Sequence, residues 1–249
     1  MRTGIVALSR ALTGALIILG SSAASAIPIN LQVFADGVLI GDVDENVLGC
    51  VDIEPGVSAQ CQATNLTYGD GYDQFSIDSL DMIIDADPVV TGTWAVTNTD
   101  GLNATQHFTM VFTLPIAPTI PGATLSGGSV SGTVADGDGN GATLSAFPGS
   151  SLYTAQIDGL DTATLYDDPS SFVAAPFDTT AIAEAIFGAP VPSLLGGPAL
   201  VSIGIVLDFE LTQFDSATFT SEHEVVPVPE PGTAALMAIG LALLARRRR

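Results

Sequence analysis

The feature that most constrains the fold of this chain is a side-chain alternation with a period of two. In residues 105–114 one set of positions carries mainly large apolar side chains, namely Gln106, Phe108, Met110, Phe112 and Leu114, and the other set is rich in threonine. A period of two places successive side chains on opposite faces of a strand, so this segment is predicted to be a half-buried strand. Similar patterns predict strands at 29–34, 74–84, 90–97, 128–134, 142–147, 151–157, 163–166, 200–214 and 217–221.

Glycine, asparagine, aspartate and proline gather between the predicted strands, for example at 97–101 and 136–141, as expected of turns. Only one segment indicates a helix, because Asp178 and the two threonines after it can cap residues 181–187, and Gly188 can end the helix. The Pro- and Gly-rich residues 188–198 are expected to form a long connection. Residues 27–226 are therefore predicted to be one all-β domain, an antiparallel, jelly-roll-like β-sandwich with one short helix.

The N-terminal residues 1–26 have the organisation of a secretory signal peptide. Arg2 and Arg10 precede a short apolar run at 11–20, and the sequence Ala24-Ser25-Ala26 matches a cleavage site of the A-x-A type. We expect a signal helix that is removed, so that the mature chain begins near Ile27. The alternative is an N-terminal membrane anchor that is never cut.

The C-terminal residues 227–249 contain three different parts. Prolines at 227, 229 and 231 favour an extended stalk that is not expected to join a packed sheet. Residues 232–245 carry no charge and would form a helix of about 21 Å, shorter than the ~30 Å hydrocarbon core of a membrane. Four arginines end the chain and would stay on the cytoplasmic side. This segment is predicted to be a marginal transmembrane helix.

The order of these parts resembles the PEP-CTERM sorting arrangement of Gram-negative bacteria. The matching residues are Pro229, Glu230, Pro231, Arg246, Arg247, Arg248 and Arg249. The resemblance implies recognition by an exosortase, a membrane-embedded enzyme similar to cysteine transpeptidases. It also implies that the protein is held transiently in the inner membrane, loses its tail, and passes to the cell surface or extracellular matrix. An ordinary C-terminal anchor is the alternative.

The charge of the body is strongly one-sided. Residues 27–226 contain no Lys or Arg and hold all of the 27 acidic residues except Glu230, which gives a formal charge of about −26. Nucleic acids and anionic membrane surfaces are excluded as partners, because binding to them requires cationic side chains. A divalent cation, a basic partner or a neutral glycan remains compatible. The acidity is equally explained by solubility in a salty medium.

The two cysteines, Cys50 and Cys61, are close together in the sequence. In an exported chain such a pair predicts one disulfide that closes a small loop and pins a hairpin or long loop. A metal site or a catalytic thiol is not favoured, because no histidine or further cysteine lies nearby.

Residues 136–141 spell D-x-D-x-N-G, the beginning of a calcium-binding loop. Asp136, Asp138 and Asn140 would supply the oxygen ligands, and Gly141 would permit the sharp turn. Position twelve, which carries a bidentate glutamate in an EF-hand, is Phe147. The favoured alternative is a hairpin turn, for which Asp-Gly and Asn-Gly are typical. No other cofactor is expected.

No residue pattern predicts catalysis. The acidic run that includes Asp85 and Asp87 could supply the carboxylate pair of a glycosidase, but a solvated loop is favoured. His107 is expected on the outer face of its strand without a partner, and His223, between two glutamates, is expected to be exposed. Trp94 could form a sugar-stacking platform with Tyr68, Tyr72, Tyr153 and Tyr166, although core packing is favoured for a tryptophan in a strand.

The sequence thus predicts an exported, non-enzymatic β-sandwich protein that an exosortase sorts through its tail. A structural or adhesive role in a polysaccharide-rich layer follows from the resemblance. The alternatives are a carbohydrate-binding module and a secreted hydrolase that acts on polysaccharide.

Overall fold

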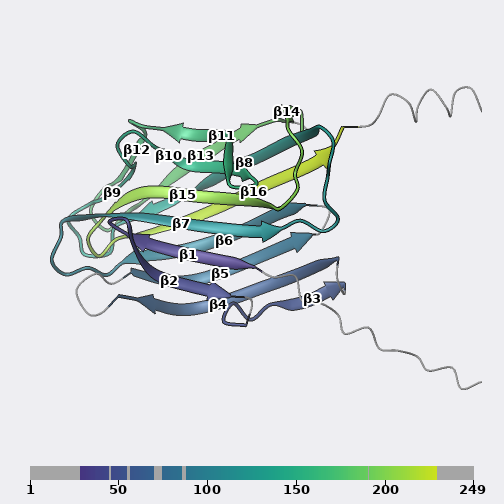
Figure 1. The fold of residues 1–249 in the computed structure, drawn as a ribbon. Coiled ribbons are helices and arrows are strands. Elements are labelled where there is room, and N and C mark those ends of the chain that lie inside the picture. Colours follow the sequence, from purple (N-terminus) through teal and green to yellow (C-terminus); the bar gives the residue numbers. More distant parts are fainter. Residues whose placement is uncertain are drawn as a thin grey trace, which may run out of the picture.

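The computed structural model describes residues 29–44, 46–54, 57–69, 75–85, 88–189 and 191–228. These residues form sixteen strands and no helix. The strands make two sheets in which every pairing is antiparallel (Figure 1). The prediction of an all-β, antiparallel architecture is therefore confirmed for the described part of the chain.

The first sheet, called sheet A, has the strand order β11-β10-β15-β7-β1-β2, with β9 pairing β15 and β12 pairing β9. Its strands are β1 (Asn30–Ala35), β2 (Val38–Asp44), β7 (Thr105–Pro115), β9 (Ala142–Ala146), β10 (Ser151–Ile157), β11 (Leu160–Asp167), β12 (Ser171–Ala174) and β15 (Ser202–Thr212).

The second sheet, sheet B, has the order β13-β8-β16-β6-β5-β4-β3, with β14 pairing β8. Its strands are β3 (Val51–Glu54), β4 (Ser58–Tyr68), β5 (Phe75–Asp85), β6 (Val89–Asn98), β8 (Thr124–Ala135), β13 (Thr179–Phe187), β14 (Leu194–Gly196) and β16 (Ser216–Pro227).

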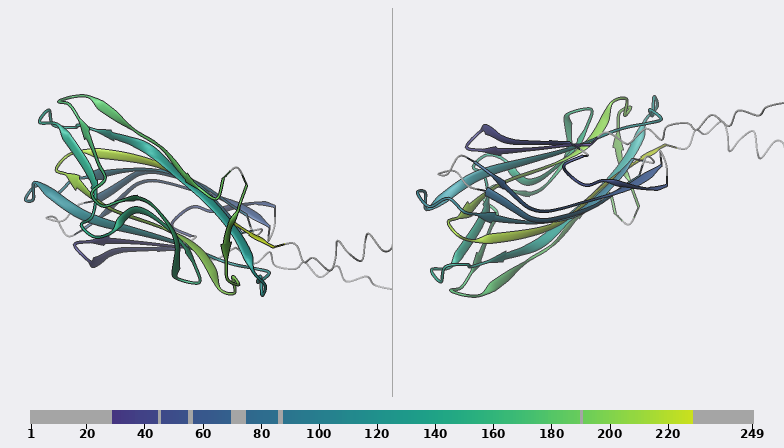
Figure 2. Two further views of the ribbon diagram at one scale, coloured as in Figure 1. Left: turned by 90° about the horizontal axis from the view of Figure 1, so that it is seen from above. Right: turned by 90° about the horizontal axis from the view of Figure 1, so that it is seen from below.

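The core lies between the two sheets, which are stacked face to face (Figure 2). Strand β7 shows the predicted alternation without a break, since every second side chain from Gln106 to Leu114 is buried. Aromatic rings join the layers: Phe108 of β7 stacks on Phe75 of β5 with ring centroids 4.4 Å apart, and Phe209 of β15 lies 5.1 Å from Phe219 of β16. Burial of one face of each sheet is the main stabilising contribution to such a fold.

The predicted helix at 181–187 is wrong. These residues belong to β13, which pairs with β8 from Thr179 opposite Ala135 to Phe187 opposite Gly128, with a bulge between Ile182 and Ala185. The alanines and the possible cap at Asp178 favoured a helix locally. Pairing along the exposed edge of β8 satisfies the same backbone groups, so tertiary context determined the outcome.

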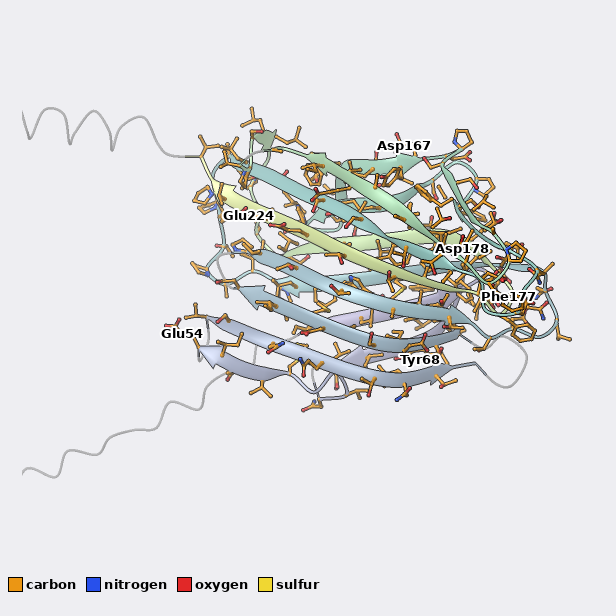
Figure 3. All side chains as sticks on the ribbon, turned by 180° about the vertical axis from the view of Figure 1, so that it is seen from behind. Glu54, Tyr68, Asp167, Phe177, Asp178 and Glu224 are labelled. Atoms are coloured by element: carbon orange, nitrogen blue, oxygen red, sulfur yellow. A yellow bond between two sulfur atoms is a disulfide. The ribbon has the colours of Figure 1, made fainter. Side chains whose placement is uncertain are left out.

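Both described chain ends lie at one end of the sandwich (Figures 1 and 2). Asn30 is opposite Thr113, near the end of β7, and Pro227 is opposite Thr124, the first residue of β8. We call this the attachment end. The opposite end, called the distal end, carries the connections β8–β9 and β15–β16. In Figure 3, Glu54 and Glu224 mark the attachment end, and Phe177 and Asp178 lie toward the distal end.

The last strand continues further than the sequence suggests. Pro227 was expected to begin a stalk outside the sheet, but it occupies the final position of β16, and the N–H of Val228 donates to the carbonyl of Ala123 at 3.0 Å. A proline is tolerated at the end of a strand because only its missing N–H donor is lost from the ladder. The folded domain therefore extends to Val228.

The predicted disulfide is confirmed: Cys50 and Cys61 are bonded, with their Cα atoms 3.9 Å apart. Cys61 lies in β4 and Cys50 directly precedes β3, so the bond ties together the hairpin at one edge of sheet B. None of the described residues belongs to a helix long and apolar enough to cross a membrane. The predicted signal helix at 1–26 and the predicted apolar helix at 232–245 lie outside the described residues.

Candidate functional site

Three carboxylates meet at the distal end of the sandwich. Asp136 and Asp138 come from the β8–β9 connection and Asp215 comes from the β15–β16 turn; an oxygen of each lies within 4.8 Å of the others. They converge because β8 and β16 are paired up to Ala135 opposite Ser216, which brings the two turns together. The cluster combines two predicted calcium ligands with a residue that the sequence analysis did not identify.

Asp136 is the anchor of the β8–β9 loop. Its carboxylate accepts backbone N–H bonds from Phe177 at 2.6 Å, Gly139 at 2.9 Å and Gly141 at 3.0 Å. The bond from Phe177 is the largest cause that lowers the pKa of Asp136 below its usual value; burial opposes it, and the two glycine bonds add to it. Asp136 therefore stays ionised and holds the loop against the chain before β13.

Asn140 donates hydrogen bonds to Asp138, whereas the calcium prediction requires it to supply an oxygen ligand. Its backbone N–H and its side-chain Nδ2 both donate to the carboxylate of Asp138, at 3.2 and 2.7 Å. These bonds are typical of a turn, in which an aspartate carboxylate accepts hydrogen bonds from its own loop. Phe147, the residue at position twelve, stacks on His107 with ring centroids 3.7 Å apart.

Asp215 is the least expected member of the cluster. It is buried, and its carboxylate accepts the N–H of Gly137 at 3.0 Å and the hydroxyl of Thr212. Burial is the main reason that its pKa is raised; these two bonds lower it, and the charges of Asp136 and Asp138 raise it. Three converging carboxylates of this kind repel one another, and a divalent cation among them would remove that repulsion.

The sequence offered little signal for Asp215. It lies 78 residues after Gly137, to whose N–H it is bonded, and it stands in an ordinary turn between two strands. Only the pairing of β8 with β16 brings it to the loop. A pairing of strands that are far apart in the sequence cannot be deduced from the local pattern.

His107 has a partner, contrary to the prediction. Its Nε2 lies 2.5 Å from Oδ1 of Asp208 and 3.3 Å from the hydroxyl of Thr109, on the outer face of sheet A. In a catalytic triad the carboxylate and the hydroxyl bind different ring nitrogens. Here both lie at Nε2, so these residues do not have triad geometry.

Trp94 and Tyr153 lie in the core and cannot contribute to an aromatic platform. Trp94 is buried, its Nε1–H donates to the hydroxyl of Ser221 at 2.9 Å, and its ring meets Phe112 of the other sheet edge-on at 5.7 Å. Tyr153 is also buried, and its hydroxyl donates to the carbonyl of Glu222 at 2.6 Å. Core packing, the favoured alternative for Trp94, is confirmed.

His223 is fully buried, so its predicted exposure is wrong as well. Its Nδ1 lies 3.1 Å from the carbonyl of Gly204 in the opposite sheet, and its Nε2 has no partner among the described residues. Burial is the main cause that lowers its pKa to about 4, and the bond to Gly204 opposes it. His223 is an interior residue and not part of an exposed site.

The acidic run before Pro88 is only partly described. Asp70, Asp73 and Asp87 lie outside the described residues. Asp78 and Asp81 lie within β5, where Asp78 accepts bonds from Ser76 and Thr97, and Asp81 accepts bonds from two glutamines of β4. These two carboxylates therefore take part in cross-strand hydrogen bonds on the surface of sheet B, within the strand predicted at 74–84.

A protein-family match covers the C-terminal residues, which follow the attachment end of the domain. The PEP-CTERM protein-sorting motif matches residues 227–249, and a comparison with curated protein sequences found no match. The match begins at the last residue of β16 and contains the Pro229, Glu230 and Pro231 element and the terminal arginines. The chain therefore carries a PEP-CTERM protein-sorting motif at residues 227–249, and this motif implies export and sorting by an exosortase to the cell surface.

Proposed function

We propose that this protein is a non-enzymatic structural or adhesive component of a polysaccharide-rich layer outside the cell. In this proposal the tail holds the exported body at the inner membrane, with its arginines in the cytoplasm, until the exosortase cuts near Pro229-Glu230-Pro231. The observation that carries the proposal is the sorting motif joined directly to a compact, acidic β-domain.

The charge of the body supports a role in such a layer. With no Lys or Arg in residues 27–226, the acidic surface has no internal basic partner other than a histidine. A body of this charge stays soluble after release and resists association with anionic surfaces. It suits a hydrated layer in which contacts are made with neutral sugars or through bridging cations.

The sorting step is tested by replacing Pro229, Glu230 and Pro231 with alanine. We expect the protein that is accessible to protease on intact cells to fall to background, because the element that the exosortase recognises is gone, while total protein remains. Leu102→Ala, at an exposed site of the body, is the control and is expected to leave surface exposure unchanged. Normal surface exposure of the variant with alanine at positions 229, 230 and 231 would contradict the proposal.

Calcium binding at the distal cluster is a second part of the proposal, supported by the convergence of three carboxylates. If the dissociation constant is about 10⁻⁴–10⁻³ M, as in extracellular modules, then 10 mM calcium would stabilise the fold by about 1–3 kcal/mol. Thermal unfolding of the exported body with and without calcium measures this effect. Asp215→Asn is expected to abolish the shift, and Asp161→Asn, on an exposed residue of β11, is expected to retain it. Equal shifts in both variants would rule out the cluster.

A carbohydrate-binding role remains the alternative, with a different surface from the aromatic platform around Trp94. A polar groove of about 370 Å³ lies on the outer face of sheet A, next to Asp208, and is lined in part by Thr154, Gln156, Asp161 and Thr164. Hydroxyl, amide and carboxylate groups are suited to sugar hydroxyls. Binding of a polysaccharide that Gln156→Ala abolishes without unfolding would favour this alternative.

A further inference from the structure

The folded domain and the sorting motif have no linker between them. The N–H of Val228 is still bonded to Ala123, and the motif match already begins at Pro227. Pro229, Glu230 and Pro231 therefore follow the domain directly, and at most ~3.5 Å per residue they reach no further than about 10 Å from Val228. A domain of this size has a radius of gyration of about 16 Å. An enzyme that holds these three residues in its active site must therefore contact the attachment end.

An apolar groove opens on the attachment end beside the start of the motif. It has a volume of about 590 Å³, and its walls include Pro88, Pro118, Ile120, Pro121 and Val226. Asp85 and Glu224 also line it. The groove lies between the start of β6, the β7–β8 connection and the last residues of β16.

The groove is built on paired backbone. The N–H of Val225 donates to the carbonyl of Pro88 at 3.0 Å, and Ile120 forms a two-way bridge with Ala199, with N–O distances of 2.7 and 2.9 Å. Prolines in the walls also restrict the backbone and present no N–H donors. A preformed apolar groove of this kind binds a partner at a lower entropic cost than a loop that must be ordered.

We infer that this groove is a docking surface for the exosortase, occupied by apolar side chains from the face of the enzyme that receives the exported chain. The inference rests on the proposed function, because it requires that the tail is processed. The enzyme is the favoured occupant since its substrate element begins within three residues of Val226, a wall residue. A second copy of the body is disfavoured by the repulsion between two strongly acidic domains.

The experiment is a double-mutant cycle on tail removal, measured by intact mass over time in cells that contain the exosortase. One change is Thr119→Glu with Pro121→Glu, which places charge in the groove at two exposed positions. The other inserts a flexible Gly/Ser linker of about twenty residues after Val228, with an end-to-end distance of about 25 Å. Leu102→Glu, at an exposed distal site, is the control for a negative charge placed away from the groove. Thermal unfolding of each released body confirms that it is folded.

We expect the groove variant to lose its tail about fivefold more slowly than the unmodified chain, which is typical of disrupting an interface contact. With the linker inserted, the enzyme reaches the motif without touching the body, so the groove substitutions are expected to have no effect. Equal rates of tail removal for the groove variant and the unmodified chain would contradict the docking inference while leaving the sorting proposal intact. The same conclusion would follow if the groove substitutions slowed tail removal equally with and without the linker. If the unmodified chain never loses its tail, the proposed function itself fails.

Discussion

Replacing Trp94 with alanine is expected to lower the free energy of unfolding by about 3–5 kcal/mol, the range for truncating a buried tryptophan. Trp94 is 1% exposed and joins the two sheets, since it lies in β6 and its ring meets Phe112 of β7. Its Nε1–H is also bonded to Ser221, which is buried and would lose this donor. Against a typical total stability of about 5–15 kcal/mol, this loss is roughly a fifth of the total or more.

Urea unfolding followed by far-UV circular dichroism measures this effect without the tryptophan signal. Trp94→Phe keeps most of the ring but removes the donor to Ser221, and it is expected to cost about 1–3 kcal/mol. Leu102→Ala, on an exposed residue, is the control and is expected to change stability by less than about 0.5 kcal/mol. An unchanged unfolding midpoint for Trp94→Ala would mean that the ring lies on the surface, as a sugar-stacking platform requires.

Lowering the pH from about 6.5 to 4 is expected to remove about 3 kcal/mol of stability through His223 alone, since each pKa unit corresponds to about 1.4 kcal/mol. The folded-state pKa of His223 is about 4, against 6.5 for an ordinary histidine. Between these values the unfolded chain binds a proton that the folded chain does not bind. Stability from this residue is therefore fully present above pH 6.5 and is lost as the pH falls toward 4.

The free energy of unfolding of the wild type and of His223→Gln, measured between pH 7.5 and 4, isolates this contribution. Aspartates whose pKa is lowered by backbone N–H bonds, such as Asp136, also lose stability in acid, but they do so equally in both proteins. The difference between the two curves is expected to change by about 3 kcal/mol across the range. A constant difference would show that His223 is accessible to water in the folded state.

Much of the fold could be predicted from local patterns. Strand β7 was predicted from its alternation because one of its faces is buried by sheet B and the other is not. The disulfide was predicted from the proximity of Cys50 and Cys61 in the sequence, and the structure shows that a single hairpin brings them together. These features depend on neighbours along the chain, which a sequence displays directly.

Two of the features that the sequence did not reveal depend on distant segments. The segment at 181–187 forms a strand because the edge of β8 is available to it. Asp215 joins the distal cluster because β16 pairs with β8. The position of His223 follows from a local pattern. Phe219, Ser221, His223 and Val225 occupy alternate positions of β16 and all face the core, whereas Glu222 and Glu224 do not. The alternation of β16 places the histidine inside even though both of its neighbours in the sequence are charged.

The two ends of the sandwich carry different features. The attachment end carries both described chain ends, the apolar groove and the start of the sorting motif. The distal end carries the carboxylate cluster. Under the proposed anchoring and release, the cluster would face away from the site of processing while the tail is in place, and both ends would be free for contacts after release.

The intact mass of the protein recovered from the surface of its own cells tests directly whether the tail is removed. We expect a mass that begins at Ile27 and ends near Pro229-Glu230-Pro231, without residues 232–245 and without the four arginines. A mass that still extends to Arg249 would contradict processing by an exosortase and would show that the tail is retained.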